Sequence, residues 1–241
     1  MRTVSMRLDG FEGRIALVTG AGGGIGRRTS ERFAEQGAKV VGLDLEPPEI
    51  PGVLGIGADV TDPEDVDAAF ARTEAELGTV ELLVICAGIF IVEPFESTTL
   101  AQWDRTMAVN LTGPFLCARR ALPGMKAAGY GRVLAIGSSA GVNGGASACA
   151  AYAASKAGVM CLAKSIANEY AGTGITSNAL APALIDTPMM GEQPPGMAER
   201  VPIGRLGTPD DVADLATYLC SSHAGYITGE VVDVNGGFLI D

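Results

Sequence analysis

The sequence predicts an α/β fold, a doubly wound, seven-stranded parallel sheet with helices on both faces. Seven short apolar runs are separated, in nearly every case, by stretches with helical character. Strands that are covered on both faces of a parallel sheet have this continuous apolar character. Right-handed crossovers then place helices on both faces, and ligands bind at the carboxyl ends of the strands. The predicted strands are 14–19, 39–43, 53–58, 81–86, 132–137, 176–180 and 230–234.

Composition and charge narrow the classes of protein that the chain can be. With 47% hydrophobic and 19% charged residues, its 241 residues predict one folded domain over 13–241 after an exposed N-terminal arm, 1–12. The net charge of -11 argues against a nucleic-acid partner. Apolar runs stay below the roughly 18 residues that span a bilayer, so no membrane partner is expected. Five widely spaced cysteines fit a reducing cytoplasm.

One long loop, 186–209, is rich in residues that break helices and strands. It contains five prolines and the pair Met189-Met190. Loops of this length inside a compact fold are often functional. We expect a lid over a substrate, and a plain surface connection is the alternative.

A glycine-rich segment follows the first predicted strand. Glycine permits a tight turn and a close approach to a pyrophosphate, whose charge is stabilised by free N–H groups at the helix N-terminus. The spacing is G-x-x-x-G-x-G, which differs from the G-x-G-x-x-G of long-chain dehydrogenases. A flexible loop is the alternative to a dinucleotide site. The residues expected to bind the dinucleotide here are Gly20, Gly24, Ile25 and Gly26.

Acidic residues end the second and third predicted strands. Asp44 lies 24 residues after Gly20, where a dinucleotide fold needs an acceptor for the adenosine ribose. A carboxylate there would repel a 2′-phosphate, and neither position 23 nor 45–50 supplies Arg or Lys to offset this repulsion. Asp44 therefore predicts NAD as the cofactor, with a turn aspartate as the alternative. Asp59, followed by Val60, is expected to accept a hydrogen bond from the adenine amino group.

Tyr152 and Lys156 are spaced i, i+4 on a predicted helix that opens at Tyr152 and runs to about Tyr170. Side chains at this spacing share one face of a helix, so the phenol and the ammonium can converge. A phenol is a poor base at neutral pH, and a nearby cation lowers its pKa. The pair therefore predicts acid–base chemistry. An interfacial tyrosine beside a solvated lysine is the alternative.

Taken together, these residues resemble the short-chain dehydrogenase/reductase family over nearly the whole chain, from Gly13 to Phe238. The family pattern T-G-x-x-x-G-x-G matches 19–26, and Y-x-x-x-K matches Tyr152 and Lys156. The resemblance implies a Rossmann-type fold and an NAD(H)-dependent oxidoreductase that moves a hydride between nicotinamide and an alcohol or carbonyl, without a metal.

The resemblance also implies roles for single residues. Tyr152 becomes the proton donor or acceptor, and Lys156 also holds the nicotinamide ribose. Asn110, which matches the helix asparagine of the family, orders a water in a proton relay. Ile185 and Thr187 meet the nicotinamide carboxamide. A homotetramer is the family's habit.

Two positions depart from the family pattern or leave it ambiguous. The family's N-N-A-G is replaced by Ile85-Cys86-Ala87-Gly88, so a backbone role is expected at Ala87 and Gly88 while the asparagine side-chain bonds are replaced or lost. The catalytic serine is Ser138 when counted along the fifth strand, and Ser139 when counted back from Tyr152. We favour Ser138, because an insertion in a loop is easier than a register slip in a buried strand.

Two other functions stay open at this point. Segments 204–207 and 226–230 resemble those of 3-oxoacyl-(acyl carrier protein) reductases, which usually favour NADPH and use an acidic partner. This acidic chain with Asp44 fits them less well than an NAD-dependent alcohol or sugar dehydrogenase. A non-catalytic dinucleotide-binding protein is the second alternative, since a fold alone does not fix function. The sequence leaves the small-molecule substrate unspecified.

Overall fold

The structure is a computed structural model that describes residues 8–145, 148–191 and 196–240. Its seven strands form one sheet in the order β3-β2-β1-β4-β5-β6-β7, and every adjacent pair is parallel. The fold class predicted from the sequence is therefore confirmed. The strands are β1 (Ile15–Thr19), β2 (Lys39–Asp44), β3 (Val53–Gly57), β4 (Leu82–Ile85), β5 (Gly131–Ile136), β6 (Ile175–Pro182) and β7 (Val231–Val234).

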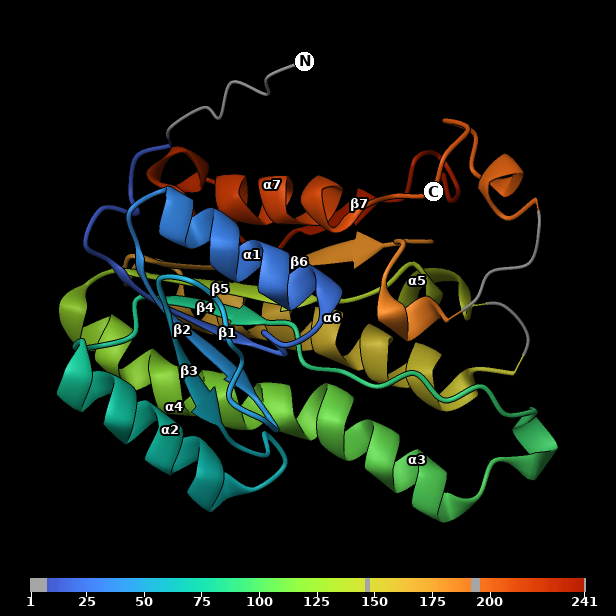
Figure 1. Cartoon of the computed structure of the whole chain (residues 1–241), viewed down its shortest axis with the longest axis horizontal. Coiled ribbons are helices and arrows are strands. Elements are labelled where there is room, and N and C mark those ends of the chain that lie inside the picture. Colours follow the sequence, from blue (N-terminus) through green and yellow to red (C-terminus); the bar gives the residue numbers. More distant parts are fainter. Residues whose placement is uncertain (1–7, 146–147, 192–195, 241) are drawn as a thin grey trace.

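Helices cover both faces of the sheet (Figure 1). On one face, α1 (Gly24–Glu35) packs beside α7 (Pro209–Cys220). The other face carries α2 (Pro63–Glu76), α4 (Gly113–Ala128) and α6 (Ala150–Tyr170). The remaining helical segments are α3 (Leu100–Met107), α5 (Ala140–Asn143), the π-helical turn η2 (Ala108–Thr112) and the 3₁₀ turns η1 (Phe95–Ser97), η3 (Pro188–Met190), η4 (Ala198–Arg200) and η5 (Ser222–Ala224).

Each face of the sheet has its own apolar core. Phe70, Leu83 and Met125 belong to the layer beneath α2, α4 and α6, and all three are fully buried. Phe33, Val84 and Leu219 belong to the layer beneath α1 and α7. Burial on both faces explains why the strands are continuous apolar runs rather than alternating ones.

The strand order reverses next to β1, which pairs with β2 on one side and β4 on the other. In an open parallel sheet, the carboxyl ends of the strands diverge at such a point and leave a crevice for ligands. The chain leaves β1 at Thr19 and enters α1 at Gly24, so the glycine-rich segment lies in this crevice. The fold thus positions the loop that the sequence assigns to a dinucleotide.

Part of the predicted N-terminal arm packs onto the domain. Phe11 is fully buried, and its ring centroid lies 5.0 Å from that of Phe33 on α1. The backbone N–H of Leu8 donates to the side-chain oxygen of Gln36 at 2.8 Å. The prediction of an exposed arm is therefore wrong for Phe11, because an apolar aromatic ring gains more from the α1 face than from water, whereas Asp9 and Glu12 are exposed. Residues 1–7 lie outside the described part of the chain.

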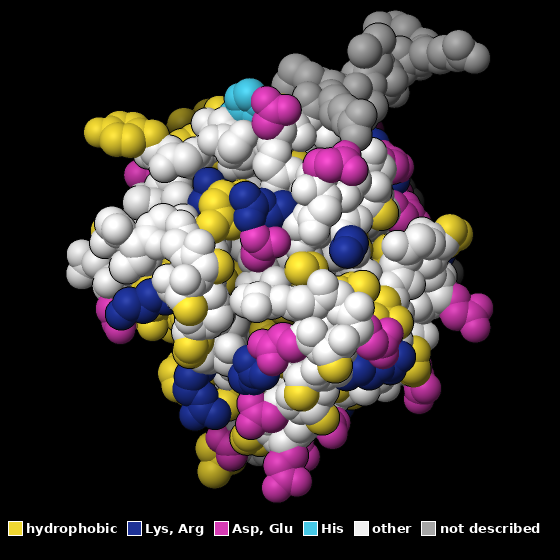
Figure 2. Space-filling model, turned by 90° about the vertical axis from the view of Figure 1, so that its left-hand side faces the viewer, with side chains coloured by type: hydrophobic (Ala, Val, Ile, Leu, Met, Phe, Trp, Pro, Cys, Tyr) yellow, Lys and Arg dark blue, Asp and Glu magenta, His cyan; other side chains and the backbone are white. Residues whose placement is uncertain are grey.

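The surface has mixed charge. On the face shown in Figure 2, the described Lys and Arg side chains are interspersed with Asp and Glu rather than gathered into one basic patch. Within the described residues, no helix is both long enough and apolar enough to cross a membrane.

Candidate active site

A cavity of about 820 Å³ opens at the carboxyl ends of the strands. It is lined by every residue that the sequence assigned to the dinucleotide, and by Ser138 and Ser139. Cavities of this size are typical of small-molecule sites. The residues assigned to the dinucleotide and found in the lining are Gly20, Gly24, Ile25, Gly26, Asp44, Asp59, Val60, Ala87, Gly88, Tyr152, Lys156, Ile185 and Thr187.

Glycine is required in the β1–α1 segment because the backbone is packed too closely for side chains. Gly20 has φ +69°, and a Cβ there would lie 2.7 Å from the backbone nitrogen of Ala87. A Cβ on Gly26 would lie 2.1 Å from the carbonyl oxygen of Gly20. The N-cap of α1 is Gly23, which has no side chain, so the first N–H groups of the helix face the cavity without a capping side chain. This cradle fits a pyrophosphate.

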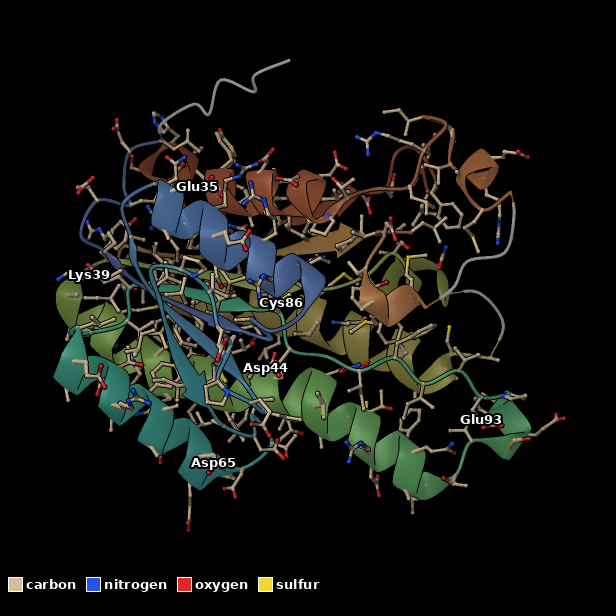
Figure 3. All side chains as sticks on the ribbon, in the orientation of Figure 1. Glu35, Lys39, Asp44, Asp65, Cys86 and Glu93 are labelled. Carbon is tan, nitrogen blue, oxygen red and sulfur yellow. The ribbon has the colours of Figure 1, made fainter. Side chains whose placement is uncertain are left out.

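Asp44 lies at the carboxyl end of β2 and braces this loop. Its Oδ2 accepts a hydrogen bond from the backbone N–H of Gly22 at 2.9 Å, and its Oδ1 accepts from that of Leu45 at 2.8 Å. Figure 3 shows Asp44 and Cys86 near the first turn of α1, whereas Lys39 lies at the other end of β2. Each carboxylate oxygen keeps a further lone pair, so Asp44 can also accept from ribose hydroxyls.

Asp59 is turned toward its own loop. Its Oδ1 accepts from both the backbone N–H and the hydroxyl of Thr61, each at 2.8 Å. Val60 lies against Gly113, where a Cβ would come within 2.9 Å of a Val60 methyl group. The Asp59 side chain is therefore fixed by a local turn, and it still borders the cavity.

The side chains of Tyr152 and Ser138 contact each other in the wall of the cavity. Their hydroxyl groups share a hydrogen bond, and Ser138 Oγ also accepts from the backbone N–H of Ala140 at 3.1 Å. The backbone N–H of Ser139 donates to the carbonyl oxygen of Pro182, and the carbonyl oxygen of Ser139 accepts from the backbone N–H of Asn143, the last residue of α5. Ser138 is thus the serine whose side chain touches the phenol.

Lys156 is a buried cation in the same place. Its side chain is 5% exposed, and Nζ donates to the carbonyl oxygen of Ile136, the last residue of β5, at 2.7 Å. Within the described residues no carboxylate forms an ion pair with it. A Cβ on Gly88 would lie 3.4 Å from Nζ, so this glycine leaves room for the ammonium group.

The pKa of the Tyr152 phenol is raised in the structure, whereas the sequence predicts that it is lowered. Burial raises the pKa of Tyr152, and the hydrogen bond from Ser138 offsets only part of this rise. Burial also lowers the pKa of Lys156 to about 8. Nζ lies 5.7 Å from the centroid of the Tyr152 ring, and burial of the phenol is the largest cause of its pKa shift. The expected lowering of the phenol pKa is therefore wrong for this structure.

Asn110 stands behind the cavity rather than in its wall. It is 1% exposed and lies in the π-helical turn η2 between α3 and α4. Its Nδ2 donates to the carbonyl oxygen of Ile89 at 2.9 Å and to Ser155 Oγ at 3.0 Å, while its Oδ1 accepts from the backbone N–H of Ile89 at 2.8 Å. Both amide protons are used, so Asn110 can offer only its oxygen atoms, as acceptors, to the predicted water.

The start of the predicted lid lies against the glycine loop. A Cβ on Gly24 would lie 2.8 Å from the Thr187 methyl group. Ile185 forms a parallel bridge to Gly207, so the two ends of the 186–209 segment are side by side. Leu184, which borders the cavity, has φ +51°, a strained value for a residue with a side chain. Positions 192–195 of the predicted lid are outside the described residues.

The sequence did not predict the roles of Phe90, which lines the cavity, or of Ser155 and Thr19, which lie behind its wall. Phe90 packs edge-on against Tyr152, with ring centroids 4.8 Å apart. Ser155 links Tyr152 on α6 to Asn110 on η2, since its Oγ donates to the carbonyl oxygen of Tyr152 at 2.8 Å and accepts from the side chain of Asn110. Thr19 Oγ1 accepts from the backbone N–H groups of Cys86 and Ala87, each at 3.1 Å. Its place at the head of the glycine motif was the available signal.

Cys86 occupies one of the positions where asparagine was expected. Burial raises the pKa of its thiol to about 12, so the thiol stays protonated at neutral pH. The two backbone bonds to Thr19 hold this strand end in place of asparagine side-chain bonds. The expected backbone role at Ala87 and Gly88 is therefore compatible with the structure.

Comparison with known proteins gives a consistent result. Residues 20–239 match the family model adh_short_C2, described as enoyl-(acyl carrier protein) reductase. The cis-4-hydroxycyclohexanecarboxylate dehydrogenase of Sinomonas cyclohexanicum is 38% identical and aligns over 95% of this chain and 98% of its own. The 3-oxoacyl-[acyl-carrier-protein] reductase of Escherichia coli is also 38% identical, over 94% of this chain and 98% of its own.

Solved structures show the same architecture. The 3-ketoacyl-(acyl-carrier-protein) reductase from Brucella melitensis, complexed with NADH, superposes with a TM-score of 0.91 at 34% identity, over 96% of this chain and all of that one. The aldohexose dehydrogenase of Thermoplasma acidophilum has a TM-score of 0.90 at 32% identity, over 96% of each chain.

Replacing Gly26 tests the packing of the glycine loop. We expect Gly26→Ala to lower the free energy of unfolding by about 2–3 kcal/mol, because the new methyl group overlaps the Gly20 carbonyl oxygen. Gly23→Ala is the control, since its Cβ would lie 3.6 Å from that oxygen, and it should cost at most about 1 kcal/mol as a weaker helix cap. Urea unfolding measures both, and equal losses would contradict the packing described here.

Proposed function

Because the chain belongs to the short-chain dehydrogenase/reductase family, we propose that it is an NAD(H)-dependent oxidoreductase that interconverts a secondary alcohol and a carbonyl compound. The observation that carries the proposal is the convergence of Tyr152, Ser138 and Lys156 on the cavity that holds the glycine loop. Membership of a family of named dehydrogenases and reductases makes the chain an enzyme and removes the non-catalytic alternative.

The cofactor side of the cavity would hold the dinucleotide at residues already described. Gly20, Gly24, Ile25 and Gly26 would surround the pyrophosphate at the first turn of α1. Asp44 would accept from the adenosine ribose, while Asp59 and Val60 would border the adenine. Ala87, Gly88, Ile185 and Thr187 would border the nicotinamide end. When bound, the dinucleotide supplies or accepts the hydride.

Tyr152 is proposed as the proton donor to the substrate oxygen. Burial raises its pKa, so the phenol holds its proton at neutral pH. Ser138 Oγ fixes the direction of the phenol and can donate to the same substrate oxygen. A protonated phenol serves the reduction of a carbonyl. In the direction of alcohol oxidation the phenol must first lose its proton, so that direction needs higher pH.

Lys156 has two proposed roles. Its ammonium group is charged below a pKa of about 8 and lies beside the phenol, where it stabilises the phenolate that remains after proton donation. Its remaining donors can bind the nicotinamide ribose. Asn110 fixes Ile89 and, through Ser155, the first turn of α6. Its oxygen atoms can also accept a hydrogen bond from the water of the proposed proton relay.

NAD(H) is proposed over NADP(H) because of Asp44. The carboxylate lies at the ribose end of the cavity and is held in place by two backbone N–H groups. The Brucella melitensis relative was crystallised with NADH, which supports the same assignment. Reduction of a 3-oxoacyl thioester is the second candidate, favoured by the reductases among the relatives.

The substrate lid, the oligomeric state and the cellular location are proposed as the sequence predicts them. We propose that 186–209 is the substrate lid, supported by the Met189 and Met190 side chains in the cavity lining. A homotetramer is supported by large apolar side chains that are exposed in the single chain. A cytoplasmic location is part of the same proposal. The exposed apolar side chains include Phe95, Leu100, Phe115, Tyr226 and Ile240.

Alanine variants separate the two serines. Ser138→Ala should lower kcat for carbonyl reduction by at least about tenfold, because it removes the hydroxyl that touches Tyr152. Ser139→Ala is the matched control and should cost less. Steady-state kinetics decides between them, and a larger loss in the Ser139 variant would contradict the assignment.

Cofactor preference tests Asp44. The wild-type kcat/KM with NADH should exceed that with NADPH by at least about 30-fold, because a 2′-phosphate loses a hydrogen bond and meets a carboxylate. Asp44→Asn keeps the size of the side chain and removes the charge, so it should narrow the ratio by about tenfold. A wild-type protein that uses NADPH as well as NADH would show that the assignment is wrong.

A further inference from the structure

Arg200 is a cation at the edge of the cavity without an acidic partner. It ends the short turn η4 and belongs to the cavity lining. Within the described residues, no carboxylate lies within ion-pair distance of its guanidinium group. Exposed arginines without an acidic partner also occur elsewhere in the described chain, as at Arg119, and exposed Arg200 differs from Arg119 in bordering the cavity.

The neighbours of Arg200 are apolar. Its guanidinium carbon lies 5.8 Å from the centroid of the Phe238 ring, and Nη1 lies 3.9 Å from Met197 Sδ. Both contacts are weak, so most of its five N–H donors keep their capacity for a stronger acceptor. Met197 and Phe238 also line the cavity, so the cation is set in an otherwise apolar wall.

The backbone beside Arg200 is anchored. Val201 is 3% exposed, and the backbone N–H of Ile203 donates to the carbonyl oxygen of Gly236 at 3.2 Å. A Cβ on Gly236 would lie 2.7 Å from a Val201 methyl group, so this part of the segment packs tightly on the C-terminal residues. Figure 1 shows the two stretches near one another beside the C-terminal label. A fixed backbone and the planar, pre-organised guanidinium fork reduce the entropy lost when an anion binds.

The acidic residues of the cavity lie elsewhere. Its lining contains two carboxylates, Asp44 and Asp59, among the described residues, and both are in the part assigned to adenosine. The other arginine of the lining, Arg105, lies on α3 one turn before Val109, and the same helical path reaches Gly113 against Val60. Arg105 therefore belongs to the wall that leads to the adenine end, whereas Arg200 belongs to the lid.

We propose that Arg200 binds a carboxylate group of the substrate. This inference rests on the function proposed above and specifies its substrate class: a ketone or secondary alcohol with an apolar body and a carboxylate distant from the reacting carbon. Met197 and Phe238 contact the apolar body, and the guanidinium fork holds both carboxylate oxygens. The phenol of Tyr152 meets the reacting oxygen at the other end of the substrate.

Binding of a substrate-like acid that cannot react tests the proposal apart from catalysis. The probes are cyclohexanecarboxylate and the neutral cyclohexanecarboxamide, titrated calorimetrically into the full-length enzyme saturated with NADH. We expect the wild-type protein to bind the carboxylate at least about tenfold more tightly than the amide. Arg200→Gln should remove this difference and leave amide binding unchanged. Raising the ionic strength should reduce the difference in the wild-type protein.

A matched control separates this role from a general effect of charge. Arg119 also lies over a phenylalanine ring, with its guanidinium carbon 5.5 Å from the Phe115 centroid, but it is outside the cavity lining. Arg119→Gln changes the net charge equally and should keep the preference for the carboxylate. Arg200→Lys should keep part of it, because the charge remains and the fork is lost.

The outcomes distinguish failure of this inference from failure of the proposed function. Equal binding of the two probes by the wild-type protein, no carboxylate binding at millimolar concentration, or loss of the preference in Arg105→Gln instead of Arg200→Gln would each overturn the assignment of Arg200. NADH titration and turnover of a ketone panel by the wild-type protein test the proposed function independently. If the wild-type protein neither binds NADH nor turns over a ketone, the proposed function fails. The same probe titration, carried out without NADH, then tests whether Arg200 binds a carboxylate.

Discussion

The hydrogen bond from the buried Lys156 ammonium group to the carbonyl oxygen of Ile136 is the constraint on which the site depends. It joins α6 to the carboxyl end of β5 and places a cation where water is largely excluded. A lysine pKa lowered to about 8 means that burying the charged ammonium group costs roughly 3 kcal/mol of folding free energy at neutral pH. The surrounding fold offsets this cost, and Gly88 leaves the space that the ammonium group needs.

Three parts of the chain that are far apart in sequence meet through close backbone packing. Gly20 and Gly26 bring the glycine loop against itself and against Ala87, while Gly24 accommodates Thr187 from the 186–209 segment. A methyl group at any of these glycines would push the glycine loop, the residues after β4 or the start of 186–209 away from the others. These three parts of the cavity wall are therefore closely packed on one another, and precise positioning of a cofactor beside a substrate requires such packing.

Periodicity and motif spacing predicted the seven strands, their parallel arrangement and the residues that line the proposed dinucleotide part of the cavity, because burial on both faces and the need for glycine act locally on the sequence. Other features depend on tertiary contacts. Asn110 lies in the π-helical turn η2 and accepts from the backbone N–H of Ile89, a contact that the motif spacing does not reveal. The raised pKa of Tyr152 follows from burial, and the cover over Phe11 comes from α1. Arg200 carries no motif, and only the folded chain shows that it borders the cavity.

The proposed proton donor in carbonyl reduction is Tyr152, held by Ser138 beside the Lys156 cation. Two measurements on Tyr152→Phe test this role: the turnover rate with NADH and a reducible ketone, and the affinity for NADH. We expect kcat to fall by at least about 100-fold, because positioned proton transfer is lost, while the dissociation constant of NADH changes by less than about threefold. A Tyr152→Phe enzyme that keeps most of the wild-type kcat would show that Tyr152 is not the proton donor.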